Sequence, residues 1–399
     1  PEDVDLGDFF GRMAFETYAE ALTGTQKAAL SAATLFAEEV PVPRSALEAA
    51  AGAHAIDEPA PALDRLLALG LLDDWGEMRG WSSMPALAHA AVNPLARSLV
   101  EPLTEADEKA LAGAVPDVLA AAWRDEDGDF PYDARAVEVC RLGLISSSPD
   151  PVLLEAAAEA AVIFLYDRSH AAPAAVVLAT RVLEALEAAG HAPGAVLLGK
   201  TINAAELIGD TELQERLLER AFAHPDLDDN NRAQFLGLRA GRLMRLGDLD
   251  EALRIRQEEL PVYEALGDRH SIALTKGQIA DIYQARGEYD EALRIYQEET
   301  LPAFEALGER REVAITRAKI ADIYQVRGEF DEALRILQEE TLPAFEALGA
   351  RREIAVNKGK IADICWFRGE FDEALRIRQE ETLPVYEALG DKRSIAINK

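Results

Sequence analysis

One sequence pattern occurs three times near the C-terminus at a spacing of 41 residues. The segment Ala280–Tyr283 (Ala-Asp-Ile-Tyr) recurs as Ala321–Tyr324 and as Ala362–Cys365, each followed by Arg-Gly-Glu, an aromatic residue and Asp-Glu-Ala-Leu-Arg-Ile. A more divergent copy, Gly247–Ile255, precedes them. Self-similarity at a period of this size predicts units that stack into an array, because one unit cannot bury its apolar face alone. Such arrays usually present binding surfaces rather than perform chemistry.

Each unit has the pattern of two antiparallel helices. In the third copy, Ile320 and Ile323 fall on one face of the first helix, and small Ala321 lets the neighbouring helix approach. Gly328 is expected to end this helix, because glycine adopts the left-handed conformation at the lowest cost. Asp331 is expected to cap the second helix.

The second helices carry two unusual features. Each contains a late proline, which removes one hydrogen bond and predicts a bend; these are Pro261, Pro302, Pro343 and Pro384. In addition, Gln257–Leu260 of the first copy is one residue shorter than the matching Gln297–Leu301 of the second. One residue added inside a helix predicts a local turn of the wider π type. Both features are interpreted as setting the curvature of the array.

These units resemble the tetratricopeptide repeat (TPR) family. In the third copy, small, aromatic, glycine, aromatic, small and large residues match the family spacing: Ala321, Tyr324, Gly328, Phe330, Ala333 and Leu337. The family unit has about 34 residues, so the longer unit is similar to those of kinesin light chains and of many bacterial signalling ATPases. The resemblance implies an all-α fold, a right-handed TPR-like α-solenoid over residues 231–399, truncated in its last repeat.

The resemblance also implies which residues face the concave groove of the array. By family spacing, the groove residues are Asp281, Gln284, Asp322, Gln325, Asp363 and Trp366. A ladder of acids ending in an aromatic residue suits a basic or amphipathic peptide. A solvated polar face that keeps the array soluble explains the same pattern, and the sequence leaves both interpretations open.

Composition narrows the classes of partner. The 399 residues carry a formal net charge of −31, which disfavours nucleic acid and anionic membranes as main partners. Cys140 and Cys365 are the only cysteines, so no disulfide framework is expected, and a reducing cytoplasm is consistent with this. The sequence opens at Pro1 and stops inside a segment that matches the one ending at Lys358. We interpret it as a piece of a longer protein.

Residues 23–103 predict a small winged-helix domain after a connecting segment, residues 1–22. Helices are expected at 26–36, 44–51 and 61–69, and a strand pair at 70–75 and 80–82. The third helix carries Arg65 beside Asp64, which makes a poor reader of phosphates or bases.

The segment Ala62–Leu72 resembles the winged helix that follows the ATPase core of STAND proteins, the switch NTPases that include NLR-type receptors. In that family a histidine after the wing senses the bound nucleotide. The matching position here is Asn93, which can donate a hydrogen bond but cannot titrate near neutral pH. Residues 104–230 are expected to form irregular helical hairpins, as degenerate TPR-like units.

One segment matches a catalytic motif. Gly194–Thr201 fits the P-loop formula, but the preceding residues predict a helix where that site needs a strand. We therefore predict a buried helix there. The six histidines are scattered and predict no metal site. No catalytic residue and no cofactor are predicted.

The resemblances together imply a function without catalysis in this part of the chain. This part of the chain would be the sensing arm of a bacterial STAND-type NTPase in signalling or anti-phage defence, and it would bind a protein or peptide in the TPR groove. The alternative is a passive TPR scaffold that mediates homo-oligomerisation or the assembly of a complex. A winged-helix transcription regulator is a third possibility, against which the charge argues.

Overall fold

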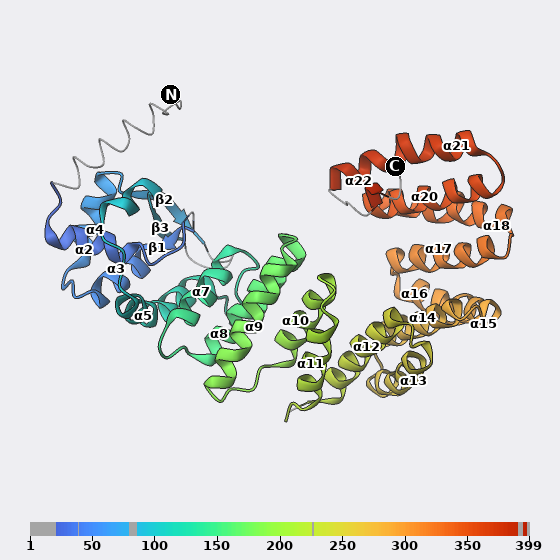
Figure 1. Cartoon of the computed structure of the whole chain (residues 1–399), viewed down its shortest axis with the longest axis horizontal. Coiled ribbons are helices and arrows are strands. Elements are labelled where there is room, and N and C mark those ends of the chain that lie inside the picture. The colour runs from blue at the N-terminus through green and yellow to red at the C-terminus, as the bar shows by residue number, and fades with distance from the viewer. Residues whose placement is uncertain (1–20, 39, 80–85, 226, 390–393, 397–399) are drawn as a thin grey trace. The chain divides into compact units, whose positions relative to one another are not determined.

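The computed structural model describes residues 21–389 except 39, 80–85 and 226, together with residues 394–396 (Figure 1). The chain forms two compact units, Pro1–Pro225 and Asp226–Lys399. Among the described residues, no helix combines the length and apolarity needed to cross a membrane.

The N-terminal unit starts with three helices and a small antiparallel sheet. The helices are α2 (Gly24–Ala33), α3 (Arg44–Ala53) and α4 (Pro59–Ala68), and the strands are β1 (Val42–Pro43), β2 (Leu72–Met78) and β3 (Leu87–Val92). The strands lie in the order β1-β3-β2. Thr23 begins α2 with a reciprocal capping box, in which Gln26 completes the second hydrogen bond.

The three expected helices are present, but the strand pair differs from the prediction. The strand that pairs with β2 is β3, whereas the expected strand at 80–82 lies outside the described residues. β3 has the sequence Leu-Ala-His-Ala-Ala-Val, and alanine is depleted in strands, so propensity did not reveal it. Burial of Ala90, Ala91 and Val92 against the helices explains why it forms.

The rest of this unit is helical. After the 3₁₀ turn η1 (Pro94–Leu99), the elements are α5 (Glu105–Ala114), α6 (Pro116–Trp123), α7 (Ala134–Ile145), α8 (Pro151–Ile163), the π-turn η2 (Phe164–Arg168), α9 (Ala172–Ala188), α10 (Ala195–Leu207) and α11 (Thr211–Phe222). Alanines such as Ala157, Ala161 and Ala179 are fully buried, which lets these helices pack closely.

The C-terminal unit consists of paired helices. The first helices of the four pairs are α12 (Asp229–Leu246), α14 (Arg269–Ala285), α17 (Arg310–Val326) and α20 (Arg351–Phe367). The second helices are α13 (Leu249–Leu266), then α15 (Tyr289–Ile295) with α16 (Leu301–Leu307), α18 (Phe330–Arg335) with α19 (Leu342–Ala347), and α21 (Phe371–Arg376) with α22 (Leu383–Leu389). One continuous core of Ala, Ile, Leu and Tyr side chains runs through the pairs.

The second helices of the last three pairs contain the predicted π-turns. These are η3 (Tyr296–Thr300), η4 (Ile336–Thr341) and η5 (Ile377–Thr382), whereas α13, which lacks the extra residue, is a regular α-helix across Pro261. In each longer copy, the proline is the second residue of the α-helix that follows the π-turn. The added residue thus accompanies the π-turn, and the proline accompanies the start of the α-helix that follows it.

The expectations for the helix ends of the third copy had different outcomes. Gly328 is left-handed, with φ of 79°, as predicted. The prediction for Asp331 was wrong, because α18 begins at Phe330 and Asp331 lies inside its first turn. Its carboxylate pairs with Arg368 of the following repeat at 3.2 Å.

Candidate functional site

Two of the predicted groove aspartates form ion pairs between neighbouring repeats. The Lys319 ammonium lies 2.7 Å from the Asp281 carboxylate, and Lys360 lies 2.7 Å from Asp322. Each lysine stands on the first helix of the next repeat, 38 residues after its aspartate. The aspartates therefore link successive first helices, and much of their charge is neutralised inside the protein.

A second partner at these aspartates changes from repeat to repeat. The Tyr296 hydroxyl donates a hydrogen bond to Asp281, and the Arg378 guanidinium donates one to Asp363. Leu337 occupies the equivalent position beside Asp322 and offers no hydrogen bond. The three aspartates are therefore chemically different although their surrounding sequences are nearly identical.

The carboxyl of Asp322 has a perturbed pKa. Burial raises the pKa of the Asp322 carboxyl, and the nearby Lys360 ammonium acts in the opposite direction. Burial and the adjacent Asp281 carboxylate likewise raise the pKa of Tyr296, so this hydroxyl remains a donor at neutral pH.

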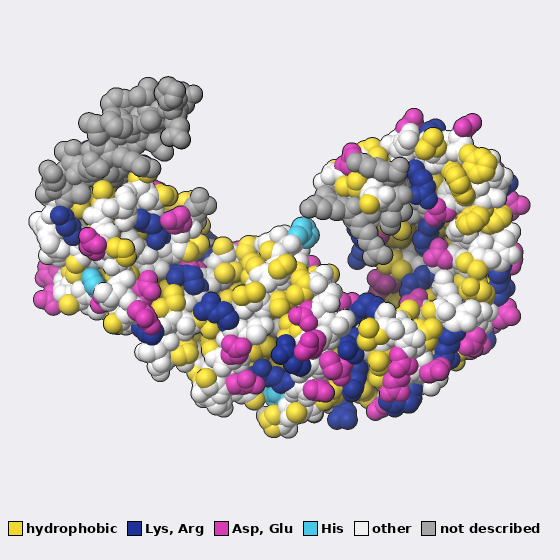
Figure 2. All heavy atoms as spheres, viewed as in Figure 1, with side chains coloured by type: hydrophobic (Ala, Val, Ile, Leu, Met, Phe, Trp, Pro, Cys, Tyr) yellow, Lys and Arg dark blue, Asp and Glu magenta, His cyan; other side chains and the backbone are white. Residues whose placement is uncertain are grey.

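The other predicted groove residues differ in exposure. Gln284 and Gln325 are half-buried on α14 and α17, whereas the Trp366 side chain is 59% exposed on α20. The Trp366 ring meets Phe371 edge-on, with ring centroids 4.7 Å apart. Trp366 therefore belongs to an aromatic cluster at the turn between α20 and α21, where hydrophobic side chains gather (Figure 2).

The lysines of these pairs were missed in the sequence. Lys319 and Lys360 recur at the 41-residue period, so the repeat pattern did contain a signal for their pairing. A second row of inter-repeat pairs was missed in the same way: Asp250 with Arg286, Asp290 with Arg327, and Asp331 with Arg368.

Asn93 uses its side chain within the N-terminal unit. Its amide oxygen accepts from the Leu95 N–H at 3.1 Å and so caps η1. Its amide nitrogen donates to Asp73 of β2 at 3.2 Å. These bonds fix the segment after the sheet, and the role in nucleotide sensing stays a prediction.

The P-loop-like segment is helical, as predicted. It forms the N-terminus of α10, and its Thr201 hydroxyl is fully buried and donates to the Leu197 carbonyl at 2.7 Å. The amide of Gly194 donates to the Glu155 carboxylate from α8. A carboxylate thus occupies the place that a phosphate would need, and it repels anions.

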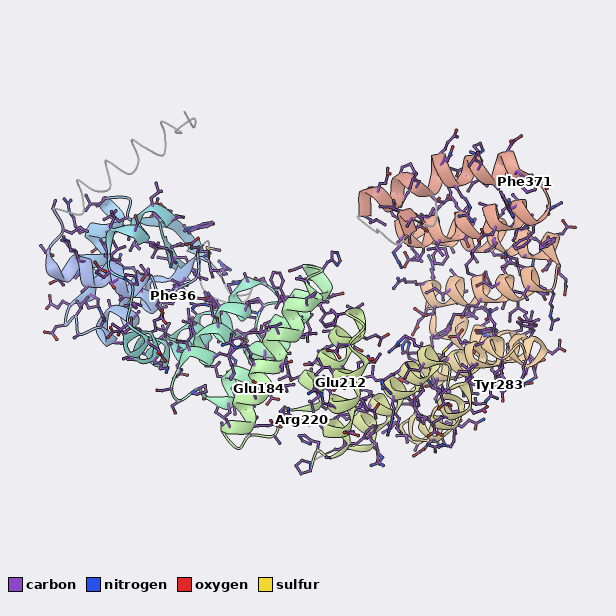
Figure 3. The ribbon with its side chains drawn as sticks, in the orientation of Figure 1. Phe36, Glu184, Glu212, Arg220, Tyr283 and Phe371 are labelled. Carbon is purple, nitrogen blue, oxygen red and sulfur yellow. The ribbon has the colours of Figure 1, made fainter. Side chains whose placement is uncertain are left out.

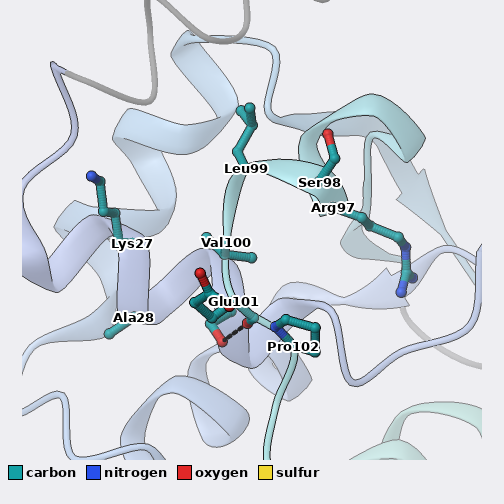
Figure 4. A pocket seen from close by; sticks show the side chains of 9 residues that line it. Lys27, Ala28, Arg97, Ser98, Leu99, Val100, Glu101 and Pro102 are labelled. Carbon is teal, nitrogen blue, oxygen red and sulfur yellow. Dashed lines mark hydrogen bonds between the residues drawn. The ribbon is translucent and has the colours of Figure 1, made fainter.

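A shallow depression lies between α2 and η1. Its lining includes Lys27, Arg97 and Glu101 (Figure 4). Arg97 points away from Lys27 and donates to the Thr34 carbonyl at 2.9 Å. The two cations do not converge, so the depression lacks the geometry of an anion site. Among the residues that the structure describes, no group of three metal-ligating side chains occurs.

Paired helices stacked at a fixed period define the C-terminal unit as a helical-repeat array. Within it, residues 231–300 and 274–341 match the tetratricopeptide repeat family, so the chain contains TPR repeats. No curated protein matches the sequence.

Several solved structures resemble the chain. A crystal structure of a STAND protein with a tetratricopeptide repeat sensor from Pyrococcus horikoshii is 16% identical, with a TM-score of 0.56. The match covers 100% of this chain and 55% of that protein. A Rap protein complexed with competence and sporulation factor is 14% identical over 74% of this chain and 90% of its own, with a TM-score of 0.47. Aspartyl phosphate phosphatase F from Bacillus subtilis is 11% identical over 74% of this chain and 87% of its own, with a TM-score of 0.46.

Proposed function

We propose that this chain is the partner-sensing arm of a bacterial, cytoplasmic STAND-type NTPase in signalling or anti-phage defence. The observation that carries the proposal is the fold similarity to the STAND protein, which extends over the whole chain at a TM-score above 0.5. The TPR repeats at residues 231–341 support an interaction role, since such arrays present extended binding surfaces. The step from fold to function is an analogy.

The N-terminal unit supports the same proposal. Residues 24–92 follow the order helix, strand, helix, helix, strand, strand, which is typical of a winged helix. Asp64 is exposed on the third helix, α4. Its carboxylate forms an ion pair at 2.6 Å with Arg44 of α3. A helix of this composition suits packing against protein better than binding a nucleic acid.

The ion pairs change the expected chemistry of the partner. Since Lys319 and Lys360 already neutralise Asp281 and Asp322, a basic peptide would have to displace an internal cation. We propose that the partner is a protein or peptide bound mainly through amide and aromatic contacts at Gln284, Gln325 and Trp366. Glutamine offers both a donor and an acceptor to a peptide backbone, and an exposed tryptophan is a frequent anchor of interfaces.

The test is affinity capture from lysate with matched baits. One bait is the chain itself, and the second carries Gln284→Ala, Gln325→Ala and Trp366→Ala. The control carries Gln338→Ala and Gln379→Ala, two exposed glutamines of the second helices. The proposal expects one protein that the chain and the control retain and that the triple variant loses at least tenfold. Equal capture by all three baits, or capture of the bait's own chain alone, overturns it and favours the passive scaffold.

A further inference from the structure

The first repeat lacks the groove aspartate that the later repeats share. The repeat pattern aligns Gly241 of α12 with these aspartates, which are Asp281, Asp322 and Asp363. On the next first helix, α14, Gln278 lies at the position of the paired lysines Lys319 and Lys360. The first repeat therefore has neither member of the ion pair that links the first helices further along the array.

The second helix of this repeat nevertheless carries a cation at the matching position. Arg256 of α13 is equivalent to Tyr296 and Arg378. These two side chains donate hydrogen bonds to Asp281 and Asp363, the groove aspartates of their own repeats. Arg256 thus lies where its equivalents bind a carboxylate of the first helix, but α12 supplies none.

Two guanidinium groups approach the space beside Gly241. A Cβ atom at Gly241 would lie 3.9 Å from Nη2 of Arg256 and 3.7 Å from Nη1 of Arg245. The helices of this pair, α12 and α13, precede α14, on which Tyr283 lies (Figure 3). Like charges repel each other, so two cations that converge on a space without a side chain favour an anion between them.

Arg256 has hydrogen-bond donors left for such an anion. Its side chain is only 8% exposed, and Nη1 donates to both carboxylate oxygens of Glu259, at 3.2 and 2.9 Å. Glu259 is also held by the Thr275 hydroxyl, which donates to it at 3.0 Å. Nη2 and Nε of Arg256 make no hydrogen bond with any residue that the structure describes. Since buried polar groups normally have partners, a carboxylate from outside the chain would complete this site.

The charge of the surrounding helix supports an anionic ligand. α12 contains one acidic residue, Asp229, and four arginines: Arg232, Arg239, Arg242 and Arg245. The chain as a whole has a formal net charge of −31. A basic helix in so acidic a chain gives the first repeat a local potential that attracts anions.

We propose that the space beside Gly241 is a subsite for a carboxylate of the groove partner, bound by Arg256 and Arg245. The carboxylate takes the place of the missing groove aspartate, so it is favoured over other anions. An acidic side chain and the free C-terminus of a peptide supply the same chemical group. The proposal deepens the proposed function and rests on its premise that the groove binds a protein or peptide.

The first test supplies the carboxylate within the chain and needs no partner. Gly241→Asp should melt about 2–4 °C above Gly241→Asn, which has the same size without the charge. The difference should vanish when both variants also carry Arg256→Met, because the cation that binds the carboxylate is then absent. If Gly241→Asp is no more stable than Gly241→Asn, or if the difference survives Arg256→Met, the subsite does not exist.

The second test measures binding by isothermal titration calorimetry. The probes are three acetylated alanine hexapeptides: one with a central Glu and an amidated C-terminus, one with a free C-terminal carboxylate, and one with a central Gln and an amidated C-terminus. At least one acidic probe should bind at least tenfold more tightly than the Gln probe, and that probe identifies the source of the carboxylate. Gly241→Asp should abolish this binding, whereas Gly241→Ala, which adds no charge, should retain it.

The outcomes separate this proposal from the proposed function. Acidic probes that bind no better than the Gln probe, or equally well to Gly241→Asp, overturn the subsite even where the capture experiment succeeds. Acidic probes that bind as expected while capture fails leave the carboxylate site in place and overturn only the role as a sensing arm.

Discussion

Lys360 on α20 reaches back one repeat to Asp322 on α17, and the two charged groups lie 2.7 Å apart. Their side chains are 23% and 30% exposed, so water screens this pair less than a surface pair. Together with the ion pair between Arg311 of α17 and Glu353 of α20, this contact adds charged links to the apolar packing between the two first helices.

The first prediction concerns this coupling. Lys360→Met should lower the free energy of unfolding by about 1–2 kcal/mol, because it leaves the Asp322 carboxylate half-buried without its cation. Urea unfolding followed by circular dichroism measures the change. Arg254→Met is the control, since its pairs with Glu251 and Glu258 lie within α13 and are exposed to water. If both variants lose equal stability, Lys360 has no special role between repeats.

The second prediction compares two threonines at the same position of successive π-turns. Thr341 is fully buried, and its hydroxyl lies 3.0 Å from the Leu337 carbonyl and 2.9 Å from the Asn357 amide oxygen. Thr341→Val should lower the free energy of unfolding by about 1–2 kcal/mol, because the buried Leu337 carbonyl and Asn357 amide oxygen lose the hydroxyl to which they are bonded. The hydroxyl of Thr300 is buried without a partner among the described residues. Thr300→Val should therefore be neutral or stabilising, and an equal loss in both variants would contradict the assignment.

The third prediction concerns Glu159 on α8. Burial and the nearby carboxylates of Glu155 and Asp129 raise the pKa of Glu159 to about 7, against the influence of Lys200. Because the folded protein holds this proton more tightly than the unfolded chain, stability falls as pH rises from about 4.5 to 7. Glu159→Gln should therefore stabilise the protein by about 1–2 kcal/mol at pH 8 and have little effect at pH 4.5. Thermal unfolding at the two pH values decides this, and a gain of equal size at both would refute the raised pKa.

The fourth prediction concerns the contact between β3 and α6. His89 is buried, its Nδ1 lies 2.6 Å from the Leu87 carbonyl, and its Nε2 accepts from the Trp123 indole N–H at 3.4 Å. Burial lowers the pKa of His89, so the folded state keeps the ring neutral. Stability should then fall as pH drops below about 6.5, the value of an unfolded histidine. His89→Gln replaces the imidazole with an amide that does not titrate. The free energy of unfolding, measured in urea, should then depend less on pH between pH 7 and 5. A pH dependence unchanged in the variant would show that other groups cause it.

The sequence predicted the repeat fold well because the determining signals are local and periodic. Gly328 and the added Thr341 each act within one turn of their own helix, so their effects follow from backbone chemistry alone. Asp331 was misassigned because its partner, Arg368, stands in the next repeat. A cap and an ion pair require the same residue type, and only the packing of repeats decides between them.

The candidate groove was harder to predict for the same reason. Family spacing placed Asp281 and Asp322 on the first helices, but not the lysines that face them across the repeat boundary. The place of Trp366 at the end of the acidic ladder stays a prediction, and family spacing gave no sign of the contact between its ring and Phe371. The partners of an exposed side chain depend on geometry between units, and a single repeat does not encode this geometry.

The changing residue beside the aspartates also bears on how the array folds. Repeats of nearly the same sequence can pair in the wrong order, which is a characteristic failure of repeat proteins. At one repeat position, Arg256 pairs with Glu259 at 2.9 Å, Tyr296 donates to Asp281, Leu337 is apolar, and Arg378 donates to Asp363. A hairpin inserted in the wrong place would bring a mismatched side chain into the interior. Because the side chain at this position differs between neighbouring repeats, it disfavours pairing of the hairpins out of order.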